Sequence, residues 1–312
     1  MTVLGIDLGG TKCLGVALES GKVVAEHRLP TPKGTDACLA ALSAVVDGLR
    51  PSGDPRAVGV GAPGLVDRSG VLRFAPNLAV DRGLNLREAL TERLGLPVAV
   101  ENDATCAASG ERAFGAARGY DHVLMVTLGT GIGGGIVVGG ELERGANGFA
   151  GEIGHMVVDP QGPRCPCGQR GCWERLASGS GLGRLAREAA HAGMADRVME
   201  VAGGDPEDVR GEHVTRCAAE GDVQARQILD RFAWWLALGL ANLANIFDPQ
   251  AFVLGGGLMV AGEAVLEPTR RAFADLLQGA PDRPPVAIVP ALLGERAGAI
   301  GAACLADQRM GS

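Results

Sequence analysis

Residues 2–18 read TVLGIDLGGTKCLGVAL, two apolar runs separated by the pair Gly9-Gly10. Runs rich in Val, Ile and Leu favour β-strands, and paired glycines between strands are typical of a tight turn. KVVAEHRL at 22–29 has the composition of a third strand. The chain is therefore predicted to begin with a three-stranded antiparallel β-meander.

The same order of strand, glycine turn and strand recurs at residues 122–140, HVLMVTLGTGIGGGIVVGG. DLGGTK at 7–12 and TLGTGIGGG at 127–135 thus look like equivalent loops in two duplicated α/β lobes. The remaining sequence predicts further strands at 57–63, 97–102, 251–255 and 286–291, and helices at 35–50, 85–95, after Asp103, and at 178–247, 260–278 and 298–308.

Composition excludes several classes of protein. A length of 312 residues exceeds what one compact core usually needs, so two lobes are expected. A net charge of -7 without a Lys/Arg block argues against a nucleic-acid partner. The uncharged stretch at 232–247 is shorter than the roughly 18 apolar residues of a membrane span and is interpreted as a buried helix. The N-terminus lacks the basic region of a secretory signal, so we expect a cytoplasmic protein without a membrane partner.

One short segment, HMVVDPQGPRCPCGQRGCWE at 155–174, holds a cluster of potential metal ligands. Three thiolates and one imidazole complete a closed tetrahedral zinc site, which organises structure and leaves no position for an activated water. The alternatives are reduced thiols without a metal, or a redox pair. The predicted zinc ligands are His155, Cys165, Cys167 and Cys172.

Three glycine-rich turns follow predicted strands, at Gly9-Gly10, Gly129–Gly135 and Gly255–Gly257. Glycine lets backbone N–H groups approach phosphate oxygens, although each turn could also serve only to reverse the chain. Gly129, Gly131 and Gly134 match G-x-G-x-x-G, but a β-hairpin follows where a dinucleotide fold needs a helix. A Rossmann fold is rejected, and a nucleotide site of another kind is expected.

Asp103 follows a predicted buried strand and opens a helix. It is either a helix N-cap or the base that accepts a hydroxyl proton in phosphoryl transfer. Glu152 and Glu174 flank the cysteine segment and are either surface charges or acceptors for the hydroxyl groups of a sugar.

Taken together, these motifs resemble those of the ROK family (repressors, open reading frames, sugar kinases), particularly its ATP-dependent bacterial glucokinases. The resemblance spans nearly the whole chain through DLGGTK, GAPGLVD (61–67), PNL (76–78), END (101–103) and TLGTGIGGG. Its most specific part is residues 154–174, which fit G-H-x6-G-x2-C-x-C-G-x2-G-C-x-E without a gap.

The resemblance implies an α/β, two-lobed actin/hexokinase-type (ribonuclease H-like) fold with a duplicated, β-meander-containing domain. The small lobe would comprise 1–118 with the C-terminal helix 298–312, and the large lobe 119–297 with the zinc loop 155–174. The implied activity is phosphorylation of glucose at its 6-hydroxyl by ATP with Mg²⁺, and Asp103 is the implied catalytic base. The implied sugar ligands are Asn77, Asn102, Asp103, Glu152, His155 and Glu174. The implied ATP-side residues are Asp7, Gly9, Gly10, Thr11, Lys12, Thr130, Gly131 and Gly256.

Three alternatives stay open. Polyphosphate could replace ATP, although relatives that use it generally lack the cysteine cluster. The sugar could be fructose, mannose, allose, N-acetylglucosamine or N-acetylmannosamine. A sugar-sensing regulator is the third, but only six residues precede Asp7, where family repressors carry a DNA-binding domain. The resemblance also implies a homodimer or homotetramer.

Overall fold

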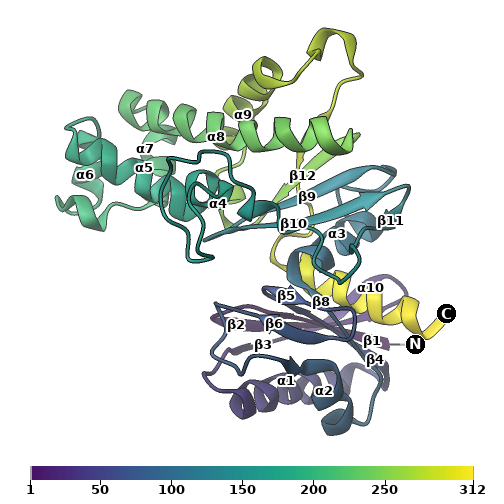
Figure 1. Cartoon of the computed structure of the whole chain (residues 1–312). Helices are drawn as coiled ribbons and strands as arrows, with labels where there is room; N and C mark the ends of the chain where they lie inside the picture. Colours follow the sequence, from purple (N-terminus) through teal and green to yellow (C-terminus); the bar gives the residue numbers. More distant parts are fainter. Residues whose placement is uncertain (1, 312) are drawn as a thin grey trace. The chain divides into compact units, whose positions relative to one another are not determined.

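The computed structural model describes residues 2–311, so the outer limits of the predicted lobes, residues 1 and 312, lie outside the described part (Figure 1). Its contacts divide the chain into two compact units. Unit 1 comprises 1–125, 134–151 and 291–312, and unit 2 comprises 126–133 and 152–290. This division differs from the predicted lobes, since Gly135 packs against Ala104 and Ala108 of unit 1. The lobe limits 118/119 and 297/298 stay a prediction.

The first sheet lies in unit 1 and begins with the predicted meander. Strands β1 (Thr2–Leu8), β2 (Lys12–Glu19) and β3 (Lys22–Pro30) pair antiparallel in sequence order. Strands β4 (Pro55–Ala62) and β8 (Val98–Asn102) extend the sheet in parallel with β1, giving the order β3-β2-β1-β4-β8. Three parallel strands therefore present their carboxyl ends at one edge.

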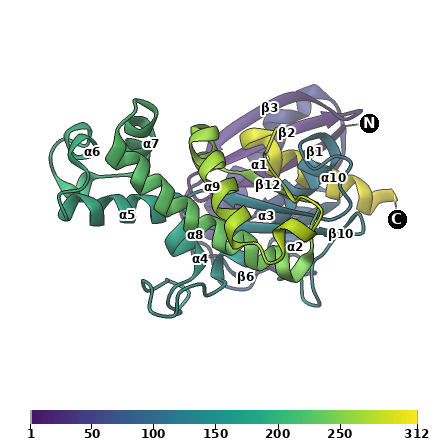
Figure 2. The same cartoon turned by 90° about the horizontal axis from the view of Figure 1, so that it is seen from above.

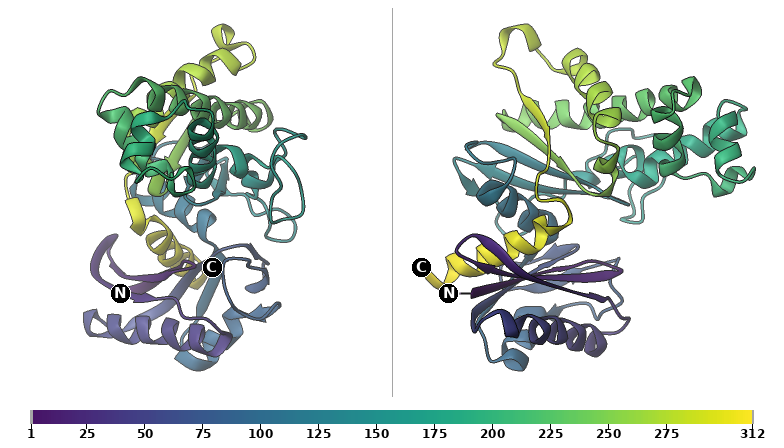
Figure 3. Two further views of the ribbon diagram at one scale, coloured as in Figure 1. Left: turned by 90° about the vertical axis from the view of Figure 1, so that its left-hand side faces the viewer. Right: turned by 180° about the vertical axis from the view of Figure 1, so that it is seen from behind.

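Helices cover both faces of this sheet (Figures 1 and 3). On one face, α1 (Thr35–Leu49) and α2 (Leu86–Leu94) bury apolar side chains against those of β1, β4 and β8. On the other, α10 (Ala297–Gly311) packs on the sheet and on α3 (Asp103–Phe114). A Cβ atom at Gly5 would lie 1.9 Å from the carbonyl oxygen of Ala299, so glycine is required for α10 to lie this close.

A small second sheet in unit 1 was not predicted. It contains β5 (Leu65–Val66), β6 (Val71–Phe74) and β7 (Leu84–Asn85), which pair antiparallel in sequence order. Strands of two residues carry no measurable periodicity, which explains why sequence patterns do not reveal them.

The third sheet repeats the strand order of the first. Its order is β11-β10-β9-β12-β13, in which three consecutive strands are followed by two later ones. The predicted recurrence of the strand, glycine turn and strand is thus confirmed. The strands are β9 (Val123–Leu128), β10 (Ile132–Val138), β11 (Glu141–Leu142), β12 (Ala251–Gly255) and β13 (Ala287–Pro290).

The predicted helical region 178–247 contains four separate helices, of which α5, α6 and α7 group together (Figure 2). Gly193, Gly203 and Gly221 adopt positive φ between them, and this conformation ends a helix. The helices of unit 2 are α4 (Trp173–Ala177), α5 (Gly179–His191), α6 (Asp196–Val201), α7 (Gly211–Ala219), α8 (Val223–Phe247) and α9 (Glu263–Leu276). Short 3-10 helices are η1 (Arg50–Ser52), η2 (Ile153–His155), η3 (Pro206–Asp208), η4 (Gly257–Ala261), η5 (Ala280–Asp282) and η6 (Gly294–Arg296).

Helix α8 contains the apolar stretch 232–247. It buries Phe232, Leu236 and Leu240 on one side and leaves Ile246 exposed at its end. Within residues 2–311, no helix has both the length and the apolar character that crossing a membrane requires.

Gly5→Ala is expected to lower the free energy of unfolding by more than about 3 kcal/mol, because the new methyl group meets backbone atoms of α10 that cannot rotate away. Urea denaturation measures the effect. Gly129→Ala is the control, since its Cβ would meet open space, and it should change stability by less than about 0.5 kcal/mol. Equal effects of the two substitutions would contradict the packing of α10 on β1.

Candidate functional site

Several predicted site residues of unit 1 gather at the carboxyl edge of its sheet. Asp7 pairs in register with Gly61 of β4, and Gly61 pairs with Glu101 of β8. Asp103 begins α3 directly after β8, and its Cα atom would lie 3.4 Å from a Cβ at Gly61. The parallel topology thus brings the carboxyl groups of Asp7 and Asp103 into one electrostatic neighbourhood.

The helix cap at this edge is Asn102 and not Asp103. The side-chain oxygen of Asn102 accepts a hydrogen bond from the Thr105 amide at 3.0 Å, and its amide group donates to the carbonyl of Gly64 at 3.2 Å. The interpretation of Asp103 as a simple N-cap is therefore wrong. Its Oδ1 instead accepts the amide of Ala104 at 2.8 Å, in the first turn of α3.

Asp7 is a partly buried acid near the end of β1. Burial, together with the nearby Asp103 carboxylate, raises the pKa of Asp7 from 3.8 to about 7, and Lys12 opposes this shift. The first turn of α10 lies close by, because a Cβ at Gly298 would be 2.9 Å from the Asp7 Cγ. An anionic pair of this kind favours a cation or a proton at the site.

The first glycine turn closes between β1 and β2. The Gly9 amide donates to the carbonyl of Lys12 at 2.9 Å, and Thr31 Oγ1 donates to the carbonyl of Gly9 at 2.7 Å. A Cβ at Gly10 would lie 2.9 Å from the carbonyl oxygen of Asn77, so these two predicted site residues are neighbours. Thr11 follows Gly10 in the same turn.

Lys12 has an ion-pair partner that the sequence did not reveal. Its Nζ lies 2.6 Å from Glu295 Oε2, and Arg28 pairs with the other oxygen of Glu295. Both partners are about half exposed, so the pair is screened and a stronger anion can replace the carboxylate.

In unit 2, the four predicted metal ligands converge. One donor atom from each of His155, Cys165, Cys167 and Cys172 lies within 4.8 Å of the other three. Cys165 Sγ is 3.8 Å from His155 Nδ1, and Cys167 Sγ is 3.6 Å from Cys172 Sγ. Tetrahedral zinc with Zn–S bonds of 2.3 Å separates its sulfur ligands by about 3.8 Å. The donor set and its spacing therefore fit zinc.

Local turns and one buried anchor hold this segment. Gly168 and Gly171 have φ of 99° and 66°, and a Cβ at Gly171 would clash with the carbonyl oxygen of Asp159. Trp173, directly after the last thiol, is fully buried, and its Nε1 donates to the carbonyl of Trp235 in α8 at 2.9 Å. The end of the segment is thereby attached to the longest helix of unit 2.

Predicted sugar ligands surround the thiols. His155 Nε2 is 3.9 Å from Glu152, while Nδ1 faces the cluster and is 3.8 Å from Glu174. Glu174 Oε1 lies 3.3 Å from Cys165 Sγ, and its Oε2 would be 2.6 Å from a Cβ at Gly131. Glu174 thus lies between the cysteine cluster and the second glycine-rich loop.

A cavity of 920 Å³ opens beside that loop, within unit 2. Of the predicted ATP-side residues, Thr130 lines it, Gly131 follows directly, and Gly256 precedes the lining residue Gly257. Gly256 has φ of 88° and a Cβ there would lie 2.5 Å from the carbonyl oxygen of Leu128, so its glycine is explained by the contact between β12 and β9.

Sequence reasoning missed most of the cavity wall. The sequence predicts a solvated loop and a helix start at 203–217, and α7 does begin there at Gly211, but the pattern does not reveal that this helix lines a cavity. Its charged side chains Glu212 and Arg216 lie one turn apart on the face that lines the cavity. The other lining residues that the sequence did not indicate include Ser180, Arg187, Thr215, Leu258, Val260 and Ala261.

Comparison with known proteins gives consistent results. The model of the ROK family matches residues 3–309. The chain is 42% identical over 309 residues to a glucokinase of Streptomyces coelicolor, covering 98% of this chain and 97% of that protein. It is 36% identical over 319 residues to a glucokinase of Thermotoga maritima, covering 100% of this chain and 99% of that protein.

Solved structures confirm the expected actin/hexokinase-type fold. The structure of a ROK family glucokinase from Streptomyces griseus in complex with glucose and AMPPNP superposes with a TM-score of 0.89. That chain is 41% identical, and the match covers 99% of this chain and 100% of that one.

Cys167→Ser is expected to abolish tight zinc binding, because a hydroxyl group does not replace a thiolate in a structural site. Cys167 is the exposed member of the cluster, so the loss should not come from a disrupted core. Elemental analysis after dialysis against a chelator should find about one equivalent of zinc in the wild type and in the control Cys304→Ser, and almost none in Cys167→Ser. Equal zinc contents would contradict the site.

Asp7→Asn is expected to stabilise the protein at neutral pH. Because folding raises the pKa of Asp7, the native state holds a proton that the unfolded state loses above about pH 4, so stability falls as pH rises until about pH 7. Asn does not titrate, so the free energy of unfolding of the variant should not fall in this way between about pH 4 and about pH 7. By about pH 7 it should exceed that of the wild type by up to the order of 4 kcal/mol. Parallel stability curves from urea denaturation at pH 4 to 8 would contradict the burial of an acid here.

Proposed function

The chain belongs to the ROK family, and from this premise we propose that it is an ATP-dependent glucokinase, which transfers the γ-phosphoryl group of ATP to the 6-hydroxyl of glucose. The observation that carries the proposal is the position of Glu174. This carboxylate contacts Cys165 on one side and lies against Gly131 on the other. A single residue thus links the cysteine segment to the loop beside the cavity.

Asp103 is the base in this proposal. It accepts the proton of the 6-hydroxyl as the oxygen attacks the γ-phosphorus, and the bond to the ADP oxygen breaks on the opposite side. The Ala104 amide, which donates to one carboxylate oxygen, fixes the group relative to α3. Positioning and charge stabilisation matter more in this reaction than the basicity of the carboxylate.

The cavity of unit 2 is proposed to take the nucleoside of ATP. Its wall combines small and apolar residues, such as Leu258 and Ala261, with the hydrogen-bonding groups of Glu212, Thr215 and Arg216. This combination suits a planar base and a ribose. Thr130 and Gly131 would contact the phosphates, as would Gly9, Gly10, Thr11 and Lys12 of unit 1.

Asp7 and Asp103 would hold a magnesium ion near the phosphates, which would supply positive charge against the charge that develops on them. The Asp7–Asp103 pair provides a reason for a cation, since positive charge stabilises two neighbouring, partly buried carboxylates. Polyphosphate is the alternative donor. Use of the nucleoside cavity distinguishes the two donors, because polyphosphate has no base to fill it.

Each unit carries some of the proposed sugar ligands. Asn77 and Asn102 belong to unit 1, whereas Glu152, His155 and Glu174 belong to unit 2. Zinc would hold His155 through Nδ1 and leave Nε2 for a hydroxyl group, which fixes the tautomer of the ring. A cytoplasmic location and a homodimer or homotetramer are the accompanying expectations.

Asp103→Asn is expected to lower kcat by at least about a hundredfold, because an amide cannot accept the hydroxyl proton. Glucose affinity, measured by calorimetry, should change by less than about threefold, since the amide keeps the shape and hydrogen-bonding capacity of the side chain. Asp36→Asn, at a largely exposed carboxylate of unit 1, is the control and should keep wild-type activity. Turnover in Asp103→Asn close to that of the wild type would remove the base assignment.

A coupled assay of ADP release tests the substrate. With ATP and Mg²⁺, the expected result is a kcat/KM for glucose that exceeds those for fructose, mannose, allose, N-acetylglucosamine and N-acetylmannosamine. Preference for another of these sugars would keep the kinase and replace its substrate. Absence of turnover with every sugar in a zinc-loaded protein would overturn the kinase and favour a sugar-sensing regulator.

A further inference from the structure

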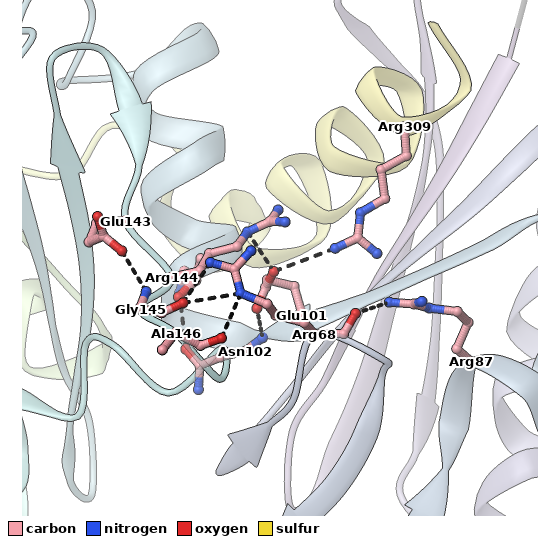
Figure 4. A network of polar contacts seen from close by, with 10 residues as sticks. Arg68, Arg87, Glu101, Asn102, Glu143, Arg144, Gly145, Ala146 and Arg309 are labelled. Carbon is pink, nitrogen blue, oxygen red and sulfur yellow. Dashed lines mark hydrogen bonds and ion pairs between the residues drawn. The ribbon is translucent and has the colours of Figure 1, made fainter. Parts of the chain in front are cut away.

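Glu101 is a buried carboxylate that the proposed mechanism does not use. Only 6% of the residue is exposed, and it lies at the end of β8, two positions before Asp103 (Figure 4). A buried charge is costly unless it is paired, so its partners indicate what it does.

The direction of the side chain follows from the alternation along β8. Val98 and Val100 belong to the core beneath α1 and α2, whereas Ala99 packs with Ala303 of α10 on the opposite face. Glu101 has the same parity as Ala99 and therefore lies on the α10 face. The carboxylate of Glu101 thus lies on the face of β8 on which Ala99 packs against the small apolar side chains of α10.

Its two oxygens have different partners. Glu101 Oε2 lies 2.9 Å from Arg144 Nε and 3.7 Å from Arg309 Nη2. Oε1 accepts a hydrogen bond from the backbone amide of Asn102 at 3.2 Å. One carboxylate therefore connects the end of β8 to the loop after β11 and to the last turns of α10 (Figure 4).

The loop that carries Arg144 is itself held by other segments of unit 1. Arg68 donates from Nη2 to the carbonyl of Gly145 at 2.6 Å, and its own carbonyl accepts from Arg87 at 2.8 Å. The Asn102 amide group donates to Gly64, just before β5. Residues 64–68, 101–102 and 144–145 thus form a connected polar network around the start of α3 (Figure 4).

Charge balance makes Glu101 the group on which this network depends. Burial, with the nearby cations Arg144 and Arg87, lowers the pKa of Arg309, and the Glu101 carboxylate counteracts this shift. Removing the negative charge leaves the partly buried guanidinium groups of Arg144 and Arg309 without their shared anion. Their repulsion should then break the contacts that hold the end of β8.

We propose that Glu101 is a positioning residue for the reaction. By holding the Glu101–Asn102 peptide between Arg144 and Arg309, it fixes the cap residue Asn102 and, one residue later, the carboxylate of Asp103. The role rests on the proposed function, because Asp103 is the base only if the chain transfers a phosphoryl group to a sugar hydroxyl. A purely structural ion pair would affect thermal stability and leave the chemical step unchanged.

The first test is kinetic. Glu101→Gln is expected to lower kcat by about tenfold to a hundredfold, since small displacements of a catalytic group have effects of this size, and to raise KM for glucose by a smaller factor because the proposed sugar ligand Asn102 shifts as well. Glu101→Asp keeps the charge and should recover part of kcat. Arg144→Lys, which keeps the cation but replaces the guanidinium group that lies against Glu101 Oε2, should also lower kcat and serves if Glu101→Gln does not fold.

Glu111→Gln is the matched control. Like Glu101, Glu111 is a buried carboxylate; it accepts hydrogen bonds from the amides of Ala116, Leu292 and Leu293, but it lies at the far end of α3 from Asp103. Its loss should lower Tm and leave kcat within about twofold at a temperature where both variants are folded. A kcat in Glu101→Gln equal to that of Glu111→Gln would overturn the positioning role.

The second test does not depend on activity. Amide hydrogen exchange in Glu101→Gln should be faster than in the wild type at residues 101–105 and 143–148, and unchanged in β2. Unchanged exchange in the first two segments would overturn the inference. Absence of wild-type turnover with any sugar would instead overturn the proposed function, while the exchange experiment would still decide whether Glu101 holds this strand end.

Discussion

Coordination of a zinc ion by one imidazole and three thiolates is the constraint that we propose for the segment carrying the proposed sugar ligands of unit 2. Between residues 156 and 170 only Gly162 and Cys165 are buried, so burial of apolar side chains cannot fix this segment. In our proposal metal coordination would add a constraint to the backbone turns of the segment, because ligands must reach fixed positions around the ion. The indole of Trp173 donates a hydrogen bond to α8 and so attaches the end of the segment to that helix. Glu174 follows one residue later.

A different kind of order holds the groups of unit 1. Three parallel strands bring Asp7 and Asp103 to one edge, where their mutual repulsion and partial burial are unfavourable. Close packing of α10 on Gly5 and the buried pairs of Glu101 stabilise the same region. The rigid secondary structure of unit 1 thus holds these two carboxylates close together although this destabilises the fold. At this position they can bind a cation or accept a proton from a reacting hydroxyl group.

Much of this could be predicted from the sequence. Both meanders follow from their glycine turns, and the metal cluster follows from its spacing, because such signals are local. The wall of the cavity could not be predicted, since Glu212 and Arg216 have the spacing of any solvated helix face. Glu101 was missed for a similar reason: its partners lie 43 and 208 positions away at Arg144 and Arg309, and only the folded chain brings them together. Roles of individual residues in binding and catalysis stay predictions that the experiments above decide.

The central claim is that zinc holds the sugar-binding side of unit 2 in shape. Calorimetric titration of glucose into zinc-loaded and zinc-depleted wild-type protein tests it most directly. The account predicts that depletion weakens glucose binding by at least about tenfold, as loss of a supporting metal environment typically does, and that added zinc restores it. Equal affinities of the two forms, with zinc removal confirmed by elemental analysis, would contradict the claim.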